Sequence, residues 1–238
     1  MIGVTRITNK DENKISHYKL YQGDCLDVMS TFKDNEFDLC LTDPPYNVDL
    51  GYDVHEDNLS YEKYKTWCSS WFTELKRISD FILITPGRSN IKMWYEIEEP
   101  KDMLLWVIKN GMTRNHLYGF LCWEPILAYG VPTNKKQGKK ELYEASLTNQ
   151  KHVGTHPCPK PLKLFTELVK TFTNEGDNVL DCFMGSGTTL YACQDLRRNC
   201  VGVELSEKYC DIIKHRCFHR RFLDRSVGYE FMIVEAEN

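Results

Sequence analysis

The sequence has no apolar run long enough to cross a membrane, and we expect no secretory leader. Its first residues, MIGVTRITNKDENK, are polar and lack the apolar core of a signal peptide. No segment approaches the roughly 20 consecutive apolar residues that a transmembrane helix needs. We therefore expect a protein of the cytoplasm, or of the host cytoplasm if the source is a virus, with no membrane partner.

The chain also lacks the cysteine spacing of a metal site or of a disulfide scaffold. It has ten cysteines, but no two of them form a C-x-x-C pair, the commonest unit of a structural zinc site. Cys40, Cys182 and Cys200 lie in apolar segments, which is typical of reduced core residues in a cytosolic protein. We expect no bound metal.

A strong charge of either sign is missing as well. The formal net charge is −4, so the overall charge neither indicates nor excludes nucleic acid, because what matters is whether Lys and Arg gather on one face. The length of 238 residues suits one domain with its own core, and the chain contains no internal repeat. We expect a single domain over 1–238 with a small insert at 131–155, a polar, lysine-rich stretch without a buried pattern.

Apolar strands alternate with amphipathic helices along the rest of the chain. This alternation predicts an α/β fold with a mostly parallel sheet and helices on both faces. We expect residues 1–16 to be loosely held, and the last residues to form a modest strand or a tail. The expected strands are 18–23, 37–42, 81–85, 103–108, 125–129, 179–183 and 200–205, and the expected helices are 25–32, 61–78, 162–172, 188–198 and 209–222.

A glycine turn, Gly185-Ser186-Gly187, stands between the expected strand 179–183 and the helix that follows it. Such a turn lets the backbone approach a ligand, and the N-terminus of the helix attracts anions. The third glycine of the dinucleotide fingerprint is replaced by Leu190, which disfavours a pyrophosphate. A nucleoside without phosphates, such as S-adenosylmethionine, fits better, with Glu204 placed for the two hydroxyls of a ribose.

A second corner, Asp43-Pro44-Pro45-Tyr46, ends the expected strand 37–42. Two prolines cannot continue a central strand, so the chain leaves the sheet there, at the edge where α/β sheets carry their sites. The Asp43 carboxylate and the Pro44 carbonyl are two acceptors in a stiffened backbone, which suits the two N–H groups of an exocyclic amine on a nucleobase. The ring of Tyr46 suits stacking on a base turned out of the duplex.

These motifs, D-P-P-Y and D-C-F-M-G-S-G-T-T, resemble those of the amino-methyltransferases that modify adenine N6 or cytosine N4 in DNA. H-P-x-x-K-P precedes the glycine motif, and this order resembles the permuted β-class of the family. The resemblance covers about residues 17–222. It implies a Rossmann-like methyltransferase sheet, S-adenosylmethionine as the cofactor and double-stranded DNA as the substrate. It allows a homodimer and a cognate restriction nuclease as partners, and the sequence decides neither.

The resemblance assigns roles residue by residue. It implies that the glycine motif lines the methionine part of the cofactor, that Glu204 holds the ribose, that Asp24 contacts the adenine amine and that Lys160 suits the methionine carboxylate. The implied catalytic residues are Asp43, Pro44, Pro45 and Tyr46. The implied cofactor residues are Asp24, Asp43, His156, Lys160, Asp181, Phe183, Gly185, Ser186, Gly187, Thr188 and Glu204. In the small insert, Lys135, Lys136, Lys139, Lys140 and Lys151 are candidates for contacts with DNA phosphates.

The chain departs from the family pattern in two places. Cys158 stands where members usually have a threonine or a similar residue, and the region 131–155 is smaller than the usual recognition region. So small a region predicts recognition that is short, relaxed or completed by a second subunit. We further expect the two corners to end on neighbouring strands and to face one cleft, because methyl transfer needs both.

Several other activities stay open. Methylation of cytosine C5 through Cys158 would leave D-P-P-Y without a role. RNA and protein-glutamine methyltransferases use related tetrapeptides that typically open with Asn, and a cofactor fold without activity is a third alternative. Asp43, in the first position of the tetrapeptide, resembles the residue of the adenine-N6 enzymes, whereas the cytosine-N4 enzymes more usually have Ser in that position. We therefore expect site-specific methylation of adenine N6, with cytosine N4 as the alternative.

Overall fold

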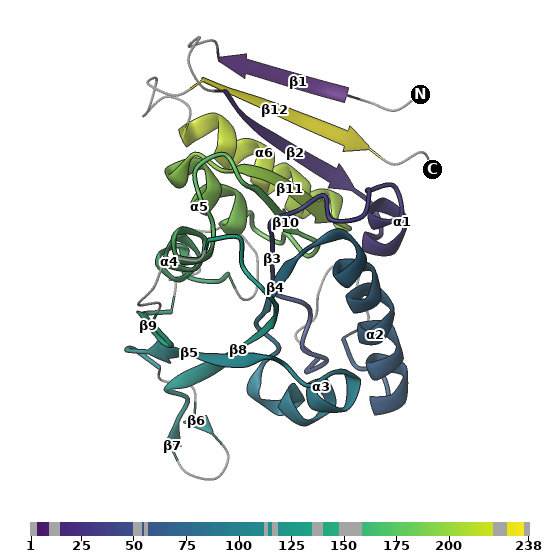
Figure 1. Cartoon of the computed structure of the whole chain (residues 1–238), viewed down its shortest axis with the longest axis vertical. Coiled ribbons are helices and arrows are strands. Elements are labelled where there is room, and N and C mark those ends of the chain that lie inside the picture. Colours follow the sequence, from purple (N-terminus) through teal and green to yellow (C-terminus); the bar gives the residue numbers. More distant parts are fainter. Residues whose placement is uncertain are drawn as a thin grey trace.

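A computed structural model of the chain describes residues 4–9, 15–49, 54, 57–111, 114–115, 119–134, 140–147, 159–220 and 228–235. One ten-stranded sheet runs through the molecule in the order β1-β12-β2-β11-β10-β3-β4-β8-β5-β9 (Figure 1). The strands are β1 (Val4–Asn9), β2 (Ile15–Gln22), β3 (Leu39–Thr42), β4 (Phe81–Ile84), β5 (Asp102–Ile108), β8 (Trp123–Gly130), β9 (Leu142–Ala145), β10 (Asn178–Asp181), β11 (Asn199–Glu204) and β12 (Gly228–Glu235), with β6 (Arg114–Asn115) and β7 (Gly119–Phe120) in a separate hairpin.

The centre of the sheet is parallel. Strands β12, β2, β11, β10, β3 and β4 all pair in parallel, whereas β8 pairs antiparallel with β4 and with β5, and β1 pairs antiparallel with β12. The helices are α1 (Cys25–Met29), α2 (Tyr61–Ile78), η1 (Arg88–Asn90), α3 (Ile91–Ile97), α4 (Leu162–Phe172), α5 (Thr188–Leu196) and α6 (Glu207–Arg220).

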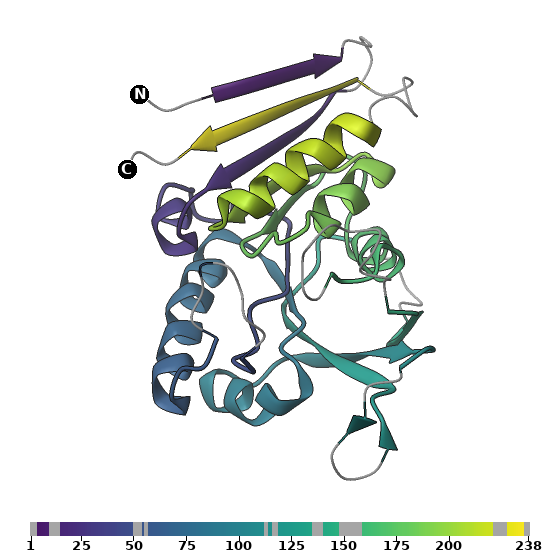
Figure 2. The same ribbon diagram turned by 180° about the vertical axis from the view of Figure 1, so that it is seen from behind.

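The helices cover both faces of the sheet, as Figures 1 and 2 show from opposite sides. Helices α4, α5 and α6 pack on one face and share a core with Leu39 and Leu41 of β3. Helices α1, α2 and α3 pack on the other face and share a core with Cys40 of the same strand. Because side chains of a strand alternate between the faces and both faces are covered, all of β3 is buried and reads as an unbroken apolar run. The predicted α/β architecture is confirmed.

The prediction that residues 1–16 are loosely held was wrong for Val4–Asn9, which form β1 and pair with β12 at the edge of the sheet. Of the two alternatives expected for the last residues, a strand or a tail, Gly228–Glu235 form the strand β12. The polar residues 10–14 lie outside the described part of the chain. An edge strand needs an apolar pattern on one face at most, which is why the polar N-terminal sequence did not indicate it.

Part of the expected insert belongs to the sheet. Residues 142–145 form β9, which pairs in parallel with β5, and both Tyr143 and Ala145 are buried. The indole N–H of Trp106 also donates to the Ala145 carbonyl at 2.9 Å. The prediction that 131–155 carries no buried pattern was therefore wrong here, because an edge strand of four residues buries only every second side chain. Residues 135–139 and 148–155 lie outside the described part.

None of the helices in the described ranges combines the length and the hydropathy that a membrane span requires.

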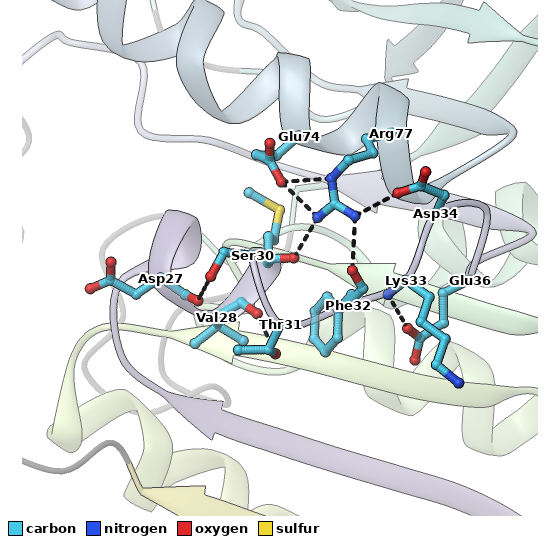
Figure 3. Close-up of polar contacts among 11 residues, drawn as sticks. Asp27, Val28, Ser30, Thr31, Phe32, Lys33, Asp34, Glu36, Glu74 and Arg77 are labelled. Atoms are coloured by element: carbon cyan, nitrogen blue, oxygen red, sulfur yellow. Dashed lines mark hydrogen bonds and ion pairs between the residues drawn. The ribbon is translucent and has the colours of Figure 1, made fainter.

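The guanidinium of Arg77, near the end of α2, joins this helix to the segment that leads from α1 to β3 (Figure 3). It donates to the carbonyl of Met29 at 3.0 Å and to that of Phe32 at 2.8 Å. It also forms ion pairs with Glu74 at 2.7 Å and with Asp34 at 2.9 Å. Because carbonyls at the end of a helix lack partners within the helix, this side chain stabilises the end of α1 and fixes the approach to β3.

We predict that Arg77→Gln lowers the melting temperature by several degrees, because the carbonyl of Met29 at the end of α1 and that of Phe32 in the segment that follows each lose a charged donor. The matched control is Lys76→Gln, which removes an ion pair with Glu98, whose two side chains are 43% and 40% exposed, and a contact of the ammonium with the Phe72 ring. It should lower the melting temperature by much less. Thermal unfolding followed by circular dichroism measures both. Equal shifts for the two variants would contradict this account.

Candidate active site

The two corners that the sequence singles out, the proline corner (residues 43–46) and the glycine corner (residues 185–187), lie side by side. Strand β10, before the glycine turn, pairs in parallel with β3, before Asp43, and Leu180 lies opposite Cys40. The Thr42 hydroxyl donates to Asp181 Oδ1 at 2.9 Å and ties the two strand ends together. Parallel strands end at the same edge of a sheet, so both corners open on the same side. The expectation that they end on neighbouring strands and share a cleft is confirmed.

The cleft encloses about 930 Å³, a figure that includes the open space at its mouth. Pro44, Tyr46 and Gly187 adjoin its lining residues in the chain, and His156 lies outside the described part. The predicted site residues that line the cleft are Asp24, Asp43, Pro45, Lys160, Asp181, Phe183, Gly185, Ser186, Thr188 and Glu204.

The carboxylate of Asp43 is the most heavily bonded group at the proline corner. Its Oδ1 accepts from the hydroxyl of Tyr46 at 2.9 Å and from that of Thr85 at 2.5 Å. Its Oδ2 accepts from the ammonium of Lys160 at 2.6 Å. Thr85 directly follows β4 and Lys160 lies just before α4, so two strand ends and the start of a helix contribute to this cluster. The role of Thr85 was not predicted, because nothing in the sequence relates it to Asp43.

Tyr46 is held in place from two sides. Its ring lies so close to Gly87 that a Cβ on this glycine would come within 2.7 Å of the ring, and the φ of Gly87 is +72°. The amide of Asn90 donates to the Tyr46 carbonyl at 2.9 Å. The hydroxyl of Tyr64 fixes the preceding residue by donating to the Pro45 carbonyl at 2.6 Å. These contacts therefore hold both the backbone of the proline corner and the ring of Tyr46 in place.

The glycine corner is organised by the buried carboxylate of Glu204, at the end of β11. Its Oε2 accepts from the Gly185 N–H at 2.7 Å and its Oε1 from the Ser206 N–H at 2.8 Å. Burial raises the pKa of this carboxyl to about 7, against the lowering effect of these hydrogen bonds. Each oxygen keeps a further lone pair for a hydroxyl donor.

Asp181 lines the cleft as its motif implies, but both of its carboxylate oxygens accept hydrogen bonds from the protein. Its Oδ1 accepts from Thr42 and from the Phe183 N–H, and its Oδ2 accepts from Thr189. Burial raises its pKa to about 6. Both oxygens thus serve the protein, and the side chain fixes the turn that carries Gly185 and does not offer an open acceptor.

Aromatic side chains form one wall of the cleft. Phe183 lies with its ring centroid 5.5 Å from that of Trp67 and 5.1 Å from that of Trp71. On the aromatic face of α2, Tyr64 and Trp71 pack in the core and are 2% and 0% exposed. Trp67 is only partly buried and lines the cleft. The sequence could not separate these residues, since they share one helical face.

Two further predicted residues have partners within the chain. Asp24 Oδ1 caps helix α1 by accepting from the Leu26 N–H at 2.8 Å, and no hydrogen bond among the described residues uses its Oδ2. Lys140 forms an ion pair with Glu167 and lies 5.0 Å from the ring centroid of Tyr143. The remaining candidates for phosphate contacts, Lys135, Lys136, Lys139 and Lys151, lie outside the described part, as does Cys158.

Glu124 of β8 is a member of the site that the sequence did not indicate. Burial is the main cause that raises the pKa of its carboxyl. The charge of Lys160 lowers this pKa and that of Asp43 raises it. Its Oε2 is buried and has no hydrogen-bond partner among the residues that the structure describes. The site therefore contains a second acid beside the Asp43–Lys160 pair.

Comparisons with known proteins agree with this geometry. A family model described as DNA methylase matches residues 37–215. The type II methyltransferase M.HpaI of Haemophilus parainfluenzae is 26% identical over 231 residues, which cover 83% of this chain and 73% of that protein.

Solved structures share the fold. The M1.HpyAVI–SAM complex has a TM-score of 0.64 at 26% identity, and the match covers 84% of this chain and 98% of that one. The cytosine-N4-specific PvuII DNA methyltransferase has a TM-score of 0.67 at 18% identity, with coverages of 90% and 89%. At this lower identity the likeness shows the fold alone.

The raised pKa of Glu204 predicts how stability depends on pH. The folded protein holds the proton up to about pH 7, whereas an unperturbed glutamic acid loses it near 4.5. The contribution of Glu204 to the free energy of unfolding is thus fully present below pH 4.5 and is lost as the pH rises through 7. We expect wild type to lose up to about 3 kcal/mol more than Glu204→Gln between pH 4.5 and pH 8. Urea unfolding at both pH values measures this difference, and parallel losses in the two proteins would refute the prediction.

Proposed function

The chain belongs to the N6/N4 DNA methylase family, and on that premise we propose that it transfers a methyl group from S-adenosylmethionine to the N6 amine of a flipped-out adenine in double-stranded DNA. The observation that carries the proposal is the shared cleft, into which the Asp43 corner and the Gly185 corner both open. A methyl donor and an amine acceptor have to meet in one such space.

The residues present fit the proposed cofactor. The two carboxylate oxygens of Glu204 are fixed by backbone N–H groups and suit the hydroxyls of a ribose. The glycine turn offers backbone without side chains, and the rings of Phe183 and Trp67 offer an apolar wall. Lys160 lies in the cleft as a cation for the amino-acid carboxylate. Asp24 has an oxygen for the adenine amine.

S-adenosylmethionine, when bound, supplies a methyl group on a sulfonium. The protein has to make the amine of the base a better nucleophile, because its lone pair is delocalised into the ring. We assign this role to the Asp43 carboxylate and the Pro44 carbonyl, which accept the two hydrogens of the amine and favour a pyramidal nitrogen. Asp43 also stabilises the positive charge that grows on the nitrogen and accepts the proton that it loses. The ring of Tyr46 stacks on the flipped base.

The choice of adenine rests on Asp43 in the first position of the tetrapeptide. Cytosine N4 is the second candidate, because its amine presents the same two donors to the same acceptors and because the cytosine-N4-specific PvuII enzyme has the same fold. We propose that residues 1–238 act as one methyltransferase domain. We also propose that the chain meets its DNA in the cytoplasm, with a cognate nuclease and a second copy of the chain as candidate partners.

We predict that Asp43→Ala lowers turnover by about 100-fold or more, because an acceptor aimed at the reacting amine is lost. Tyr46→Ala should lower turnover as well, through the loss of stacking. Affinity for the cofactor should fall much less in both. The control is Asp49→Ala, an exposed aspartate in the loop that follows, and it should keep full activity.

The assay is incorporation of labelled methyl groups into unmodified genomic DNA, followed by digestion to nucleosides and mass spectrometry. N6-methyladenine is the expected product. N4-methylcytosine would overturn the choice of base, and full activity of either site variant would overturn the assigned roles.

A second prediction concerns Gly87, which lies under the ring of Tyr46. Gly87→Ala would place a Cβ 2.7 Å from this ring in a backbone with positive φ, so the ring has to move and turnover should fall at least about ten-fold. Gly176→Ala is the matched control, because Gly176 also has a positive φ of +89° but no atom within 4 Å of the added Cβ. Its turnover, measured at equal temperature on folded protein, should stay close to wild type. A Gly87→Ala enzyme with normal turnover would show that the ring position is unimportant.

A further inference from the structure

Lys160 is the residue that connects the two corners of the cleft. Its ammonium donates to Asp43 Oδ2 at 2.6 Å and lies 4.8 Å from the ring centroid of Tyr46. Its own carbonyl accepts from the hydroxyl of Thr188, the first residue of α5, at 3.3 Å. The side chain is only 7% exposed. A single residue thus contacts the proline corner through its side chain and the glycine corner through its backbone.

The observed pairing is unfavourable for the proposed chemistry. Oδ1 of Asp43 already accepts from the hydroxyls of Tyr46 and Thr85, and Oδ2 accepts from Lys160. An amine hydrogen has to compete with these donors for the same carboxylate. The nitrogen of the amine also gains positive charge during methyl transfer, and an ammonium beside Asp43 cancels much of the field that would stabilise this charge.

Lys160 cannot simply leave the carboxylate. An ammonium in a buried position is costly unless it is paired, so on leaving Asp43 it needs another anion within reach. Glu124 is one acid whose charge interacts with Lys160, and a ligand carboxylate in the cleft is another. The cleft that Lys160 lines also contains Gly185 and Thr188 of the glycine corner. This is the place where the amino-acid end of the proposed cofactor, with its carboxylate, would lie. Exchange of one carboxylate for another keeps the ammonium paired throughout.

We propose that Lys160 is a positioning residue that alternates between two carboxylates, that of Asp43, as in this structure, and that of the cofactor. Transfer to the cofactor opens Oδ2 of Asp43 to the amine of the target base. Binding is then ordered, with the cofactor before the base. The inference rests on the proposed function, since it needs a ligand that carries a carboxylate and a substrate that carries an amine.

The test compares two nucleosides that differ in the relevant group. S-adenosylhomocysteine carries the amino-acid carboxylate, whereas 5′-methylthioadenosine has the same nucleoside and thioether without it. Thermal unfolding of wild type, Asp43→Asn, Lys160→Met and the double variant gives the energetic coupling between the two side chains. We expect coupling in the protein alone and with methylthioadenosine, and its loss with S-adenosylhomocysteine. Coupling that persists with S-adenosylhomocysteine would overturn the exchange.

Ligand affinity gives a second readout that does not depend on activity. Lys160→Met should weaken the binding of S-adenosylhomocysteine by about ten-fold or more and leave the affinity for methylthioadenosine within about two-fold of wild type. Lys160→Arg should restore part of the lost affinity for S-adenosylhomocysteine. Equal weakening of both ligands would reduce Lys160 to a packing role and overturn the proposal.

A measurement on wild-type protein covers the case in which a variant does not fold. In lysine-selective ¹⁵N spectra, the Lys160 ammonium signal should shift with S-adenosylhomocysteine and stay in place with methylthioadenosine. An unchanged signal in the presence of bound S-adenosylhomocysteine would overturn the exchange alone. Failure of wild type to bind either nucleoside would instead overturn the proposed function, so the two failures can be told apart.

Discussion

The site depends on the parallel pairing of β3 with β10 at the centre of the sheet. This pairing brings Asp43 and Gly185, which are far apart in the chain, to the same edge of the sheet. The hydrogen bond from the Thr42 hydroxyl to Asp181 fixes the two strand ends against each other in a buried setting, where it is stronger than it would be in water. Helices pack on both faces of these strands, so the strand ends have little freedom to separate.

Each corner then orients a carboxylate with fixed donors. At the glycine corner, backbone N–H groups of Gly185 and Ser206 direct Glu204, and burial raises its pKa to about 7. At the proline corner, hydroxyl groups and the Lys160 ammonium direct Asp43. The two settings differ in one respect that matters for chemistry. Glu204 is held by neutral amides and can accept further donors, whereas Asp43 is held by a cation that competes with a substrate amine.

The edges of the sheet are less closely tied to the site. On one side β12 and β1 extend the sheet beyond β2, and on the other side β5 and β9 extend it beyond β8. Strand β8 adds Glu124, whose carboxyl interacts electrostatically with Lys160 and Asp43, and its buried Oε2 has no hydrogen-bond partner in the described part of the chain. A buried oxygen without a hydrogen bond is costly in a stable fold. Because Glu124 lies beside Asp43 and Lys160, the net charge of the site depends on all three groups.

The sequence by itself determined the central architecture and both corners, because these depend on local patterns. The apolar run of β3, the amphipathic helices α2 and α4, the prolines after Asp43 and the glycines after Asp181 each specify their structure within a few residues. Edge strand β9 was missed, since it buries only every second side chain, and β1 was missed because it lies in a polar N-terminal sequence. Tertiary structure alone decided the partners of Asp43: Thr85 and Lys160 come from other strand ends and loops, and no spacing in the chain records such a contact. It also decided that the oxygens of Asp181 bind protein hydroxyls and a backbone N–H, because only the packed sheet brings Thr42 and Thr189 to the same carboxylate.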